Sequence, residues 1–261
     1  MDEHARSHSG VSVRGLIGRA WPILVWIAVW ALAARMLAQP VLLPSPLQTL
    51  ARLAALAQEG EFWRSIVRSL GGIAVGFALA CVLGVALAAA SYASTAVRRL
   101  LAPIVGAIKA APVASFIILV LVWVSSRDLS RVISFLMGFP IVYTNVLEAL
   151  LATDERMLEM AQVFGLSTTA RIRSIYLSQV LPAFEAACSL ALGFCWKAGI
   201  AAEVIGLPDH TIGDHLHDAK IYLDTPALFA WTVAIIVLSV AIERAVRALI
   251  SRAVDAIEAH A

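Results

Sequence analysis

The sequence predicts an all-α integral membrane protein, a polytopic bundle of about six transmembrane helices. Of its 261 residues, 61% are hydrophobic and only 15% are charged, and the mean hydropathy is +0.85. Soluble domains contain only about 45–50% apolar residues, so lipid is the expected solvent. The small net charge of +2 gives no support to nucleic-acid binding.

Six apolar stretches are long enough to cross the hydrocarbon core, which takes about 20 residues of helix. They are residues 16–38, 66–91, 101–125, 132–151, 180–205 and 227–250. The first is longer than a signal-peptide core and lacks a small-residue cleavage site, which favours an uncleaved span. Pro103 and Pro112 predict that the third stretch is tilted or broken before residue 111, and Pro140 predicts a kink in the fourth.

The connections also carry structural signals. Leucines at helical spacing after Pro46 predict a short interfacial helix over residues 47–58. Residues 125–129, polar except for Leu129, predict a tight turn between the third and fourth spans, and residues 213–222 predict a helix in the loop before the last span.

Basic residues predict that both termini are cytoplasmic, because they concentrate on that side of a membrane protein. An N-terminus inside places the larger group of arginines on the cytoplasmic side: Arg6, Arg14, Arg19, Arg98, Arg99, Arg156, Arg171, Arg173, Arg244, Arg247 and Arg252. We therefore expect a cytoplasmic tail over 1–15, a transmembrane domain over 16–250 and a second cytoplasmic tail over 251–261.

The loop over residues 153–178 predicts two short helices with a sharp break. Gly165 suits the left-handed conformation that ends a helix, and the Ser167 side chain can cap the next one. Apolar residues are spaced to line one inner face on each side of the break: Leu158, Ala161 and Phe164, then Ile172, Ile175 and Tyr176. This pattern is equally typical of a lever for a soluble partner and of a solvated connecting loop.

Within this loop, Glu159, Ala161, Gly165, Ile175 and Leu177 follow the spacing of the cytoplasmic signature of ATP-binding-cassette importer permeases. Met160 and Ser178 depart from it, at positions where the signature has Ala and Pro. With Leu43-Pro44-Ser45-Pro46 after the first span and Gly193, Trp196 and Glu203 in the fifth, the chain resembles the nitrate, sulfonate and taurine branch of that family.

The resemblance implies that this loop is a coupling-helix loop, which docks in a groove of an ATPase subunit. By position, the residues that would make this contact are Glu159, Ala161, Gly165, Leu166, Ser167, Thr168 and Thr169. It further implies three protein partners: a cytoplasmic nucleotide-binding subunit, an extracytoplasmic substrate-binding protein and a second permease copy in a homodimer. The expected substrate is a small solute such as nitrate, a sulfonate, taurine or a related compound, and the expected location is the inner membrane.

Charged residues within the spans are candidates for the translocation pathway, since a charge at the bilayer centre costs a few kcal/mol. Lys197 and Glu203 lie about 240° apart around one helix and are expected to face different neighbours. Lys197, beside Trp196, is expected to face a cavity, whereas Lys109 and Glu203 could equally reach the headgroups or pair across helices.

No enzymatic chemistry is expected. The sequence lacks a Gly-x-x-x-x-Gly-Lys-Ser/Thr run, so ATP hydrolysis is expected on another polypeptide. The three cysteines are interpreted as small buried hydrophobes, the histidines of the last loop as solvated, and no metal or cofactor is expected. A stand-alone secondary carrier and an intramembrane enzyme are the alternative functions.

Overall fold

The computed structural model describes residues 13–258, with side chains described at 21–250 and at 252. The predicted N-terminal tail, with Arg6, lies largely outside the described residues. In chain order the elements are α1 (Val13–Leu37), α2 (Pro46–Leu56), α3 (Gly60–Ala93), α4 (Thr95–Ala110), α5 (Val113–Leu121), α6 (Ser126–Leu151), α7 (Glu155–Val163), α8 (Thr168–Arg171), the π-helical turn η1 (Ile172–Tyr176), α9 (Leu177–Gly206), α10 (Ile212–Ile221) and α11 (Thr225–Glu258).

The all-helical fold is confirmed over the described residues, but the count of six spans is not. Four helical segments are long and apolar enough to cross a membrane: α3, α6, α11 and the continuous stretch Thr168–Gly206 that ends in α9. The pair α4 and α5 makes a fifth if it counts as one broken span, and the described apolar part of α1, Trp21–Leu37, is shorter.

The predicted break in the third stretch is present and sharp. The chain bends by 108° between α4 and α5. Pro112 disfavours helical geometry at the residue before it, and Ala111 is extended, with φ −78° and ψ 138°. Alone, α5 is too short to cross the hydrocarbon core.

The predicted turn over residues 125–129 is wrong by a few residues. The connection ends at Ser125, and residues 126–129 form the first turn of α6. Asp128 is favourable there because a carboxylate complements the positive end of the helix dipole, and it pairs with Arg131 one turn later.

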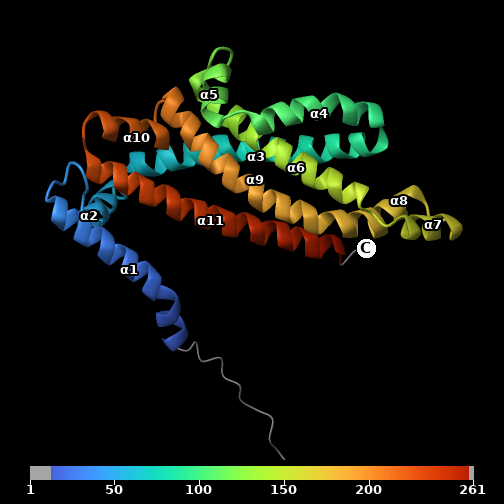
Figure 1. The fold of residues 1–261 in the computed structure, drawn as a ribbon, viewed down its shortest axis with the longest axis horizontal. Helices are drawn as coiled ribbons and strands as arrows, with labels where there is room; N and C mark the ends of the chain where they lie inside the picture. Colours follow the sequence, from blue (N-terminus) through green and yellow to red (C-terminus); the bar gives the residue numbers. More distant parts are fainter. Residues whose placement is uncertain (1–12, 259–261) are drawn as a thin grey trace, which may run out of the picture.

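The centre of the bundle is α6, packed between α3 and α9 (Figure 1). Residues of α3 that face α6 are small and recur every four positions: Gly72, Gly76, Ala80, Gly84 and Ala88. A Cβ added at Gly76 would lie 2.3 Å from the carbonyl oxygen of Arg131. Small residues therefore let the two backbones approach closely, as in other membrane helix pairs.

The bundle has two ends that differ in their loops (Figure 1). We call the end that carries α7 and α8 the elbow end, and the other the α10 end. The C-terminal end of α11 lies at the elbow end, and this helix continues through Glu258, so the described part of the predicted tail over 251–261 is helical. At the α10 end, α1 contacts α2 and then diverges from the bundle.

Candidate functional site

The elbow over residues 155–176 has the two short helices and the sharp break that the sequence predicts. The Asp154 side chain caps α7 by accepting a hydrogen bond from the Arg156 amide at 2.9 Å. After α7 ends, Gly165 adopts φ +62°, and the Leu166 amide donates to the Ala161 carbonyl at 2.9 Å. The Ser167 hydroxyl then accepts from the Ala170 amide at 3.3 Å and starts α8.

The seven predicted coupling residues separate by exposure. Ala161 is buried and Leu166 is half-buried, so these two hold the elbow together. The exposed ones are Glu159, Gly165, Ser167, Thr168 and Thr169. They form an accessible surface at the break, with Thr168 and Thr169 in the first turn of α8.

The apolar tip of the elbow differs from the sequence prediction. Phe164, expected on an inner face, is 75% exposed, and Val163 beside it is 84% exposed. Ile172 is exposed as well, whereas Ile175 is buried. Because Phe164 is the C-cap residue that follows the last residue of α7, the chain leaves the helical path there and helical spacing no longer fixes the direction of its side chain. The tip thus presents large apolar side chains beyond the bundle.

Side-chain contacts of Tyr92, Tyr176 and Gln179 attach the elbow to the spans. The Tyr92 hydroxyl at the end of α3 lies 3.1 Å from that of Tyr176 in η1, and the rings meet edge to face. The Gln179 side chain accepts from the Asp154 amide at 3.3 Å. Because α8, η1 and α9 form one continuous helical stretch, the second half of the elbow and α9 belong to the same helix.

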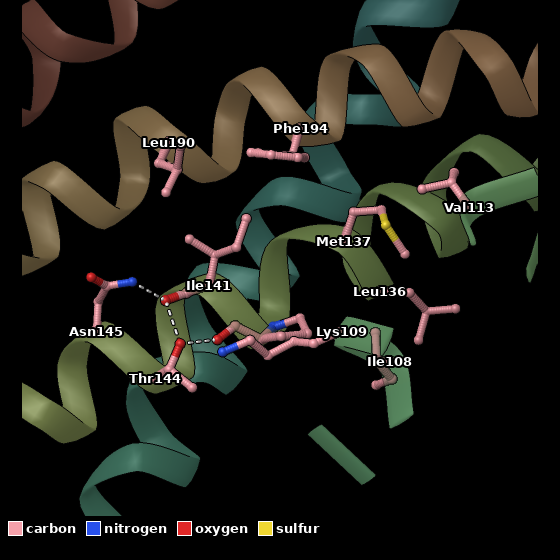
Figure 2. Close-up of a pocket in the computed structure, with 11 residues that line it drawn as sticks. Ile108, Lys109, Val113, Leu136, Met137, Ile141, Thr144, Asn145, Leu190 and Phe194 are labelled. Atoms are coloured by element: carbon pink, nitrogen blue, oxygen red, sulfur yellow. Dashed lines mark hydrogen bonds between the residues drawn. The ribbon is translucent and has the colours of Figure 1, made fainter. Parts of the chain in front are cut away.

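A pocket of about 410 Å³ lies between α4, α5, α6 and α9. Figure 2 shows Lys109 beside Thr144 on one side of it, with Leu190 and Phe194 of α9 opposite. The side chains of Thr144 and Asn145 both donate to backbone carbonyls of α6, Thr144 to Pro140 at 2.5 Å and Asn145 to Ile141 at 2.8 Å. Thr144 and Asn145 are not among the residues predicted from the sequence, although a polar pair after Pro140 in an apolar span could have indicated them.

A second, shallower pocket of about 390 Å³ adjoins the first along α9. It is lined by Lys197 and by Glu243 of α11, whose carboxylate pairs with Arg247 of the same helix, and it shares Leu190 and Phe194 with the first pocket. Lys109 and Lys197 are both exposed, and neither is in an ion pair within the described part of the chain. We call this surface, with its two lysines and the ridge of Leu190 and Phe194, the lysine face.

Trp196 and Glu203, the other two pathway candidates, are buried away from the lysine face. A Glu203 carboxylate oxygen accepts from the Ser69 hydroxyl at 2.7 Å and from the Gly213 amide at 3.3 Å. Glu203 thereby joins α9 to α3 and to the start of α10. It also lies at the edge of a small cavity of about 180 Å³ lined by Arg68, Arg127 and others near the α10 end.

The histidine-rich loop holds structural contacts. His215 stacks on Trp231 with ring centroids 4.9 Å apart, and His210 pairs with Glu61 at 2.6 Å. Among the described residues, no group of three or more His, Cys, Asp or Glu side chains is placed to hold a metal ion.

Long apolar helices around a common centre, with a helical elbow at one end, define a multi-pass membrane protein. Residues 80–255 match the family of binding-protein-dependent transport system inner membrane components. The chain belongs to this family. It is a permease component of a binding-protein-dependent importer in the inner membrane, and the family implies a binding protein and an ATPase as partners.

Individual relatives agree with this assignment. A formylaminopyrimidine transport permease protein of Halalkalibacterium halodurans is 26% identical over 79% of this chain and 82% of its own length. Putative aliphatic sulfonates transport permease proteins are similar too. The one from Bacillus subtilis is 24% identical over 84% of this chain and 78% of its own length. The one from Escherichia coli is 29% identical over 76% of each chain.

Proposed function

We propose that two copies of this chain form an alternating-access pathway for a small anionic organic solute, driven by a separate ATPase subunit that docks on the elbow. A substrate-binding protein delivers the solute at the α10 end, and both termini lie in the cytoplasm. The chain itself hydrolyses no ATP and carries no metal or cofactor.

The exposed apolar tip of the elbow carries this proposal. Val163 and Phe164 project beyond the bundle, and the capped turn at Gly165 and Ser167 fixes their direction. Large apolar side chains are costly in water and are typical of the central contacts of protein interfaces. A groove on the ATPase subunit would cover them, and the Tyr92–Tyr176 contact would carry its movement to α3 and α9.

The lysine face supports both the second copy and the anionic substrate. An unpaired lysine facing hydrocarbon is unfavourable by about 2.5–3.5 kcal/mol on insertion scales, so this face is better suited to a water-filled passage than to lipid. A second copy would enclose that passage. Lys109 and Lys197 would then attract an anion, in line with the sulfonates named for the two relatives.

The docking proposal is tested by purifying the tagged chain from membranes that also contain its ATPase subunit, and quantifying that subunit by mass spectrometry. Phe164→Ala should reduce recovery at least tenfold, because truncating a central interface anchor costs more than about 1.4 kcal/mol. Trp123→Ala is the matched control. Trp123 is 73% exposed in the turn before α6, remote from the elbow, and its loss should leave recovery unchanged.

Equal recovery with Phe164→Ala and with the unaltered chain would contradict docking on the elbow tip. Recovery of the chain without any ATPase subunit would favour a stand-alone carrier.

A further inference from the structure

Two cysteines that are far apart in the sequence meet inside the bundle. Cys81 of α3 and Cys188 of α9 are 107 positions apart, and their sulfur atoms are 3.7 Å apart. Cys188 is buried, with 1% of its surface exposed, whereas Cys81 is half-buried at the edge of the core. One thiol of the pair is therefore protected, and the other is open toward the outside of the bundle.

The third cysteine, Cys195, does not face another thiol. Cys195 is fully buried, and its thiol donates to the Ser134 carbonyl oxygen of α6 at 3.0 Å. It lies two helical turns beyond Cys188, and its hydrogen bond joins α9 to α6. The structure thus separates a facing pair of thiols from a single thiol that is already hydrogen-bonded.

We propose that Cys81 and Cys188 are an oxidisable pair that forms a reversible disulfide between α3 and α9. A disulfide bond is about 2.05 Å long, so the sulfur atoms need to approach by about 1.7 Å from their separation of 3.7 Å. Rotation of the two side chains supplies movement on this scale. The two helices are already packed together at this level, because Ala80 beside Cys81 and Ala191, about one turn after Cys188, are fully buried in the same cluster.

The oxidant is an apolar hydroperoxide dissolved in the bilayer. The outward face of α3 next to Cys81 is apolar and exposed, with Leu79 and Val82 on it, which gives such a molecule access. The Cys81 sulfur attacks the terminal peroxide oxygen, the O–O bond breaks, and Cys81 becomes a sulfenic acid while the peroxide leaves as an alcohol. The Cys188 sulfur then attacks the Cys81 sulfur, and water leaves. In sum, two thiols lose two hydrogen atoms, that is two protons and two electrons, which reduce the hydroperoxide to the alcohol and water.

The bond would fasten the helix that carries the elbow to α3. Because the stretch Thr168–Gly206 is continuous, Cys188 lies on the same helical rod as α8 and η1. This property is independent of the proposed docking of an ATPase, since the oxidation takes place within one chain.

The test uses the full chain in proteoliposomes, treated with cumene hydroperoxide as the apolar probe. The chain is then unfolded in sodium dodecyl sulfate so that every remaining thiol is accessible, these thiols are blocked with N-ethylmaleimide, and intact mass and peptide mapping are measured with and without dithiothreitol. We expect a peptide that links Cys81 to Cys188, the loss of two hydrogen atoms, and a single maleimide adduct, on Cys195. Dithiothreitol should release the link and restore both thiols.

Cys195→Ser is the matched control and should still form the link, whereas Cys81→Ser and Cys188→Ser should not. Links that involve Cys195, links between two copies, or full alkylation of Cys81 and Cys188 after treatment would each overturn the proposal. The unaltered chain decides between these outcomes even if a variant fails to fold.

Discussion

At the scale of single residues, burial separates charged groups that the sequence presents as alike. Lys197 and Glu203 lie on the same helix within a predicted span, yet Lys197 is exposed beside a pocket and Glu203 is buried against Ser69 and Gly213. A buried carboxylate needs hydrogen-bond donors, and one oxygen of Glu203, Oε2, has them from α3 and α10, whereas the other, Oε1, is buried without a partner. We therefore interpret Glu203 as a residue that positions helices, and the two lysines as candidates for contact with substrate.

The lysines can be tested by charge reversal in the reconstituted transporter, with uptake of a radiolabelled alkanesulfonate as the measurement. Lys109→Glu should lower uptake at least tenfold, because a carboxylate repels the anion and loses the attraction of the ammonium group, together more than about 1.4 kcal/mol. Lys109→Arg keeps the charge and should retain most of the uptake.

Arg252→Glu is the control for a general effect of charge, since Arg252 is exposed near the C-terminal end of α11, away from both the lysine face and the α10 end. Normal sulfonate uptake by the Lys109→Glu variant would show that Lys109 does not contact the substrate in the passage.

At the scale of elements, the contact between α3 and α6 depends on small side chains. The glycines recur at four-residue spacing, so they lie on one side of α3 and form a stripe without bulk. In lipid there is little hydrophobic drive between helices, and close van der Waals packing stabilises such a pair instead.

Gly76→Leu should destabilise the bundle, with a lowered midpoint of thermal unfolding in detergent measured by intrinsic fluorescence. A side chain there would meet the Arg131 carbonyl and the Ser134 Cβ, and overpacking of this kind costs about 1–3 kcal/mol. Gly71→Leu should change the midpoint little, because an added Cβ at Gly71 meets nothing within 4 Å. If both variants unfold at the same temperature, the stripe does not govern the contact.

The elbow shows which features of a helical element the local sequence predicts and which it does not. The left-handed conformation of Gly165 and the helix cap by Ser167 could be predicted from residue type, because each depends only on the neighbouring backbone. The direction of Phe164 could not, since it depends on where α7 ends and the chain turns.

At the scale of the whole molecule, the elbow and the C-terminal end of α11 lie together, and α10 lies at the opposite end (Figure 1). The elbow end also carries Arg98, Arg99, Arg156, Arg171 and Arg173 in its helices and loops. Basic residues concentrate on the cytoplasmic side, so this arrangement favours a cytoplasmic elbow.

The orientation is testable with single cysteines placed in a chain whose three native cysteines are replaced by serine. Val163→Cys at the elbow and Tyr222→Cys at the α10 end suit this purpose, because Val163 is 84% and Tyr222 is 78% exposed. In spheroplasts, a membrane-impermeant maleimide should label Tyr222→Cys at once and Val163→Cys only after permeabilisation. The reverse pattern would place the elbow outside and rule out docking of a cytoplasmic ATPase on it.

The sequence by itself determined the membrane class, the helical stretches and the turn of the elbow. The length of an apolar stretch, a glycine such as Gly165 and a capping serine such as Ser167 act locally along the chain. Their effects can therefore be predicted without knowing which helices pack together. The tertiary structure decided which residues share a surface. The lysine face combines α4, α6 and α9, Glu203 meets Ser69 across two helices, and Cys81 meets Cys188 over 107 positions. Such neighbours depend on the rotation and contact of whole helices, which a single sequence does not specify.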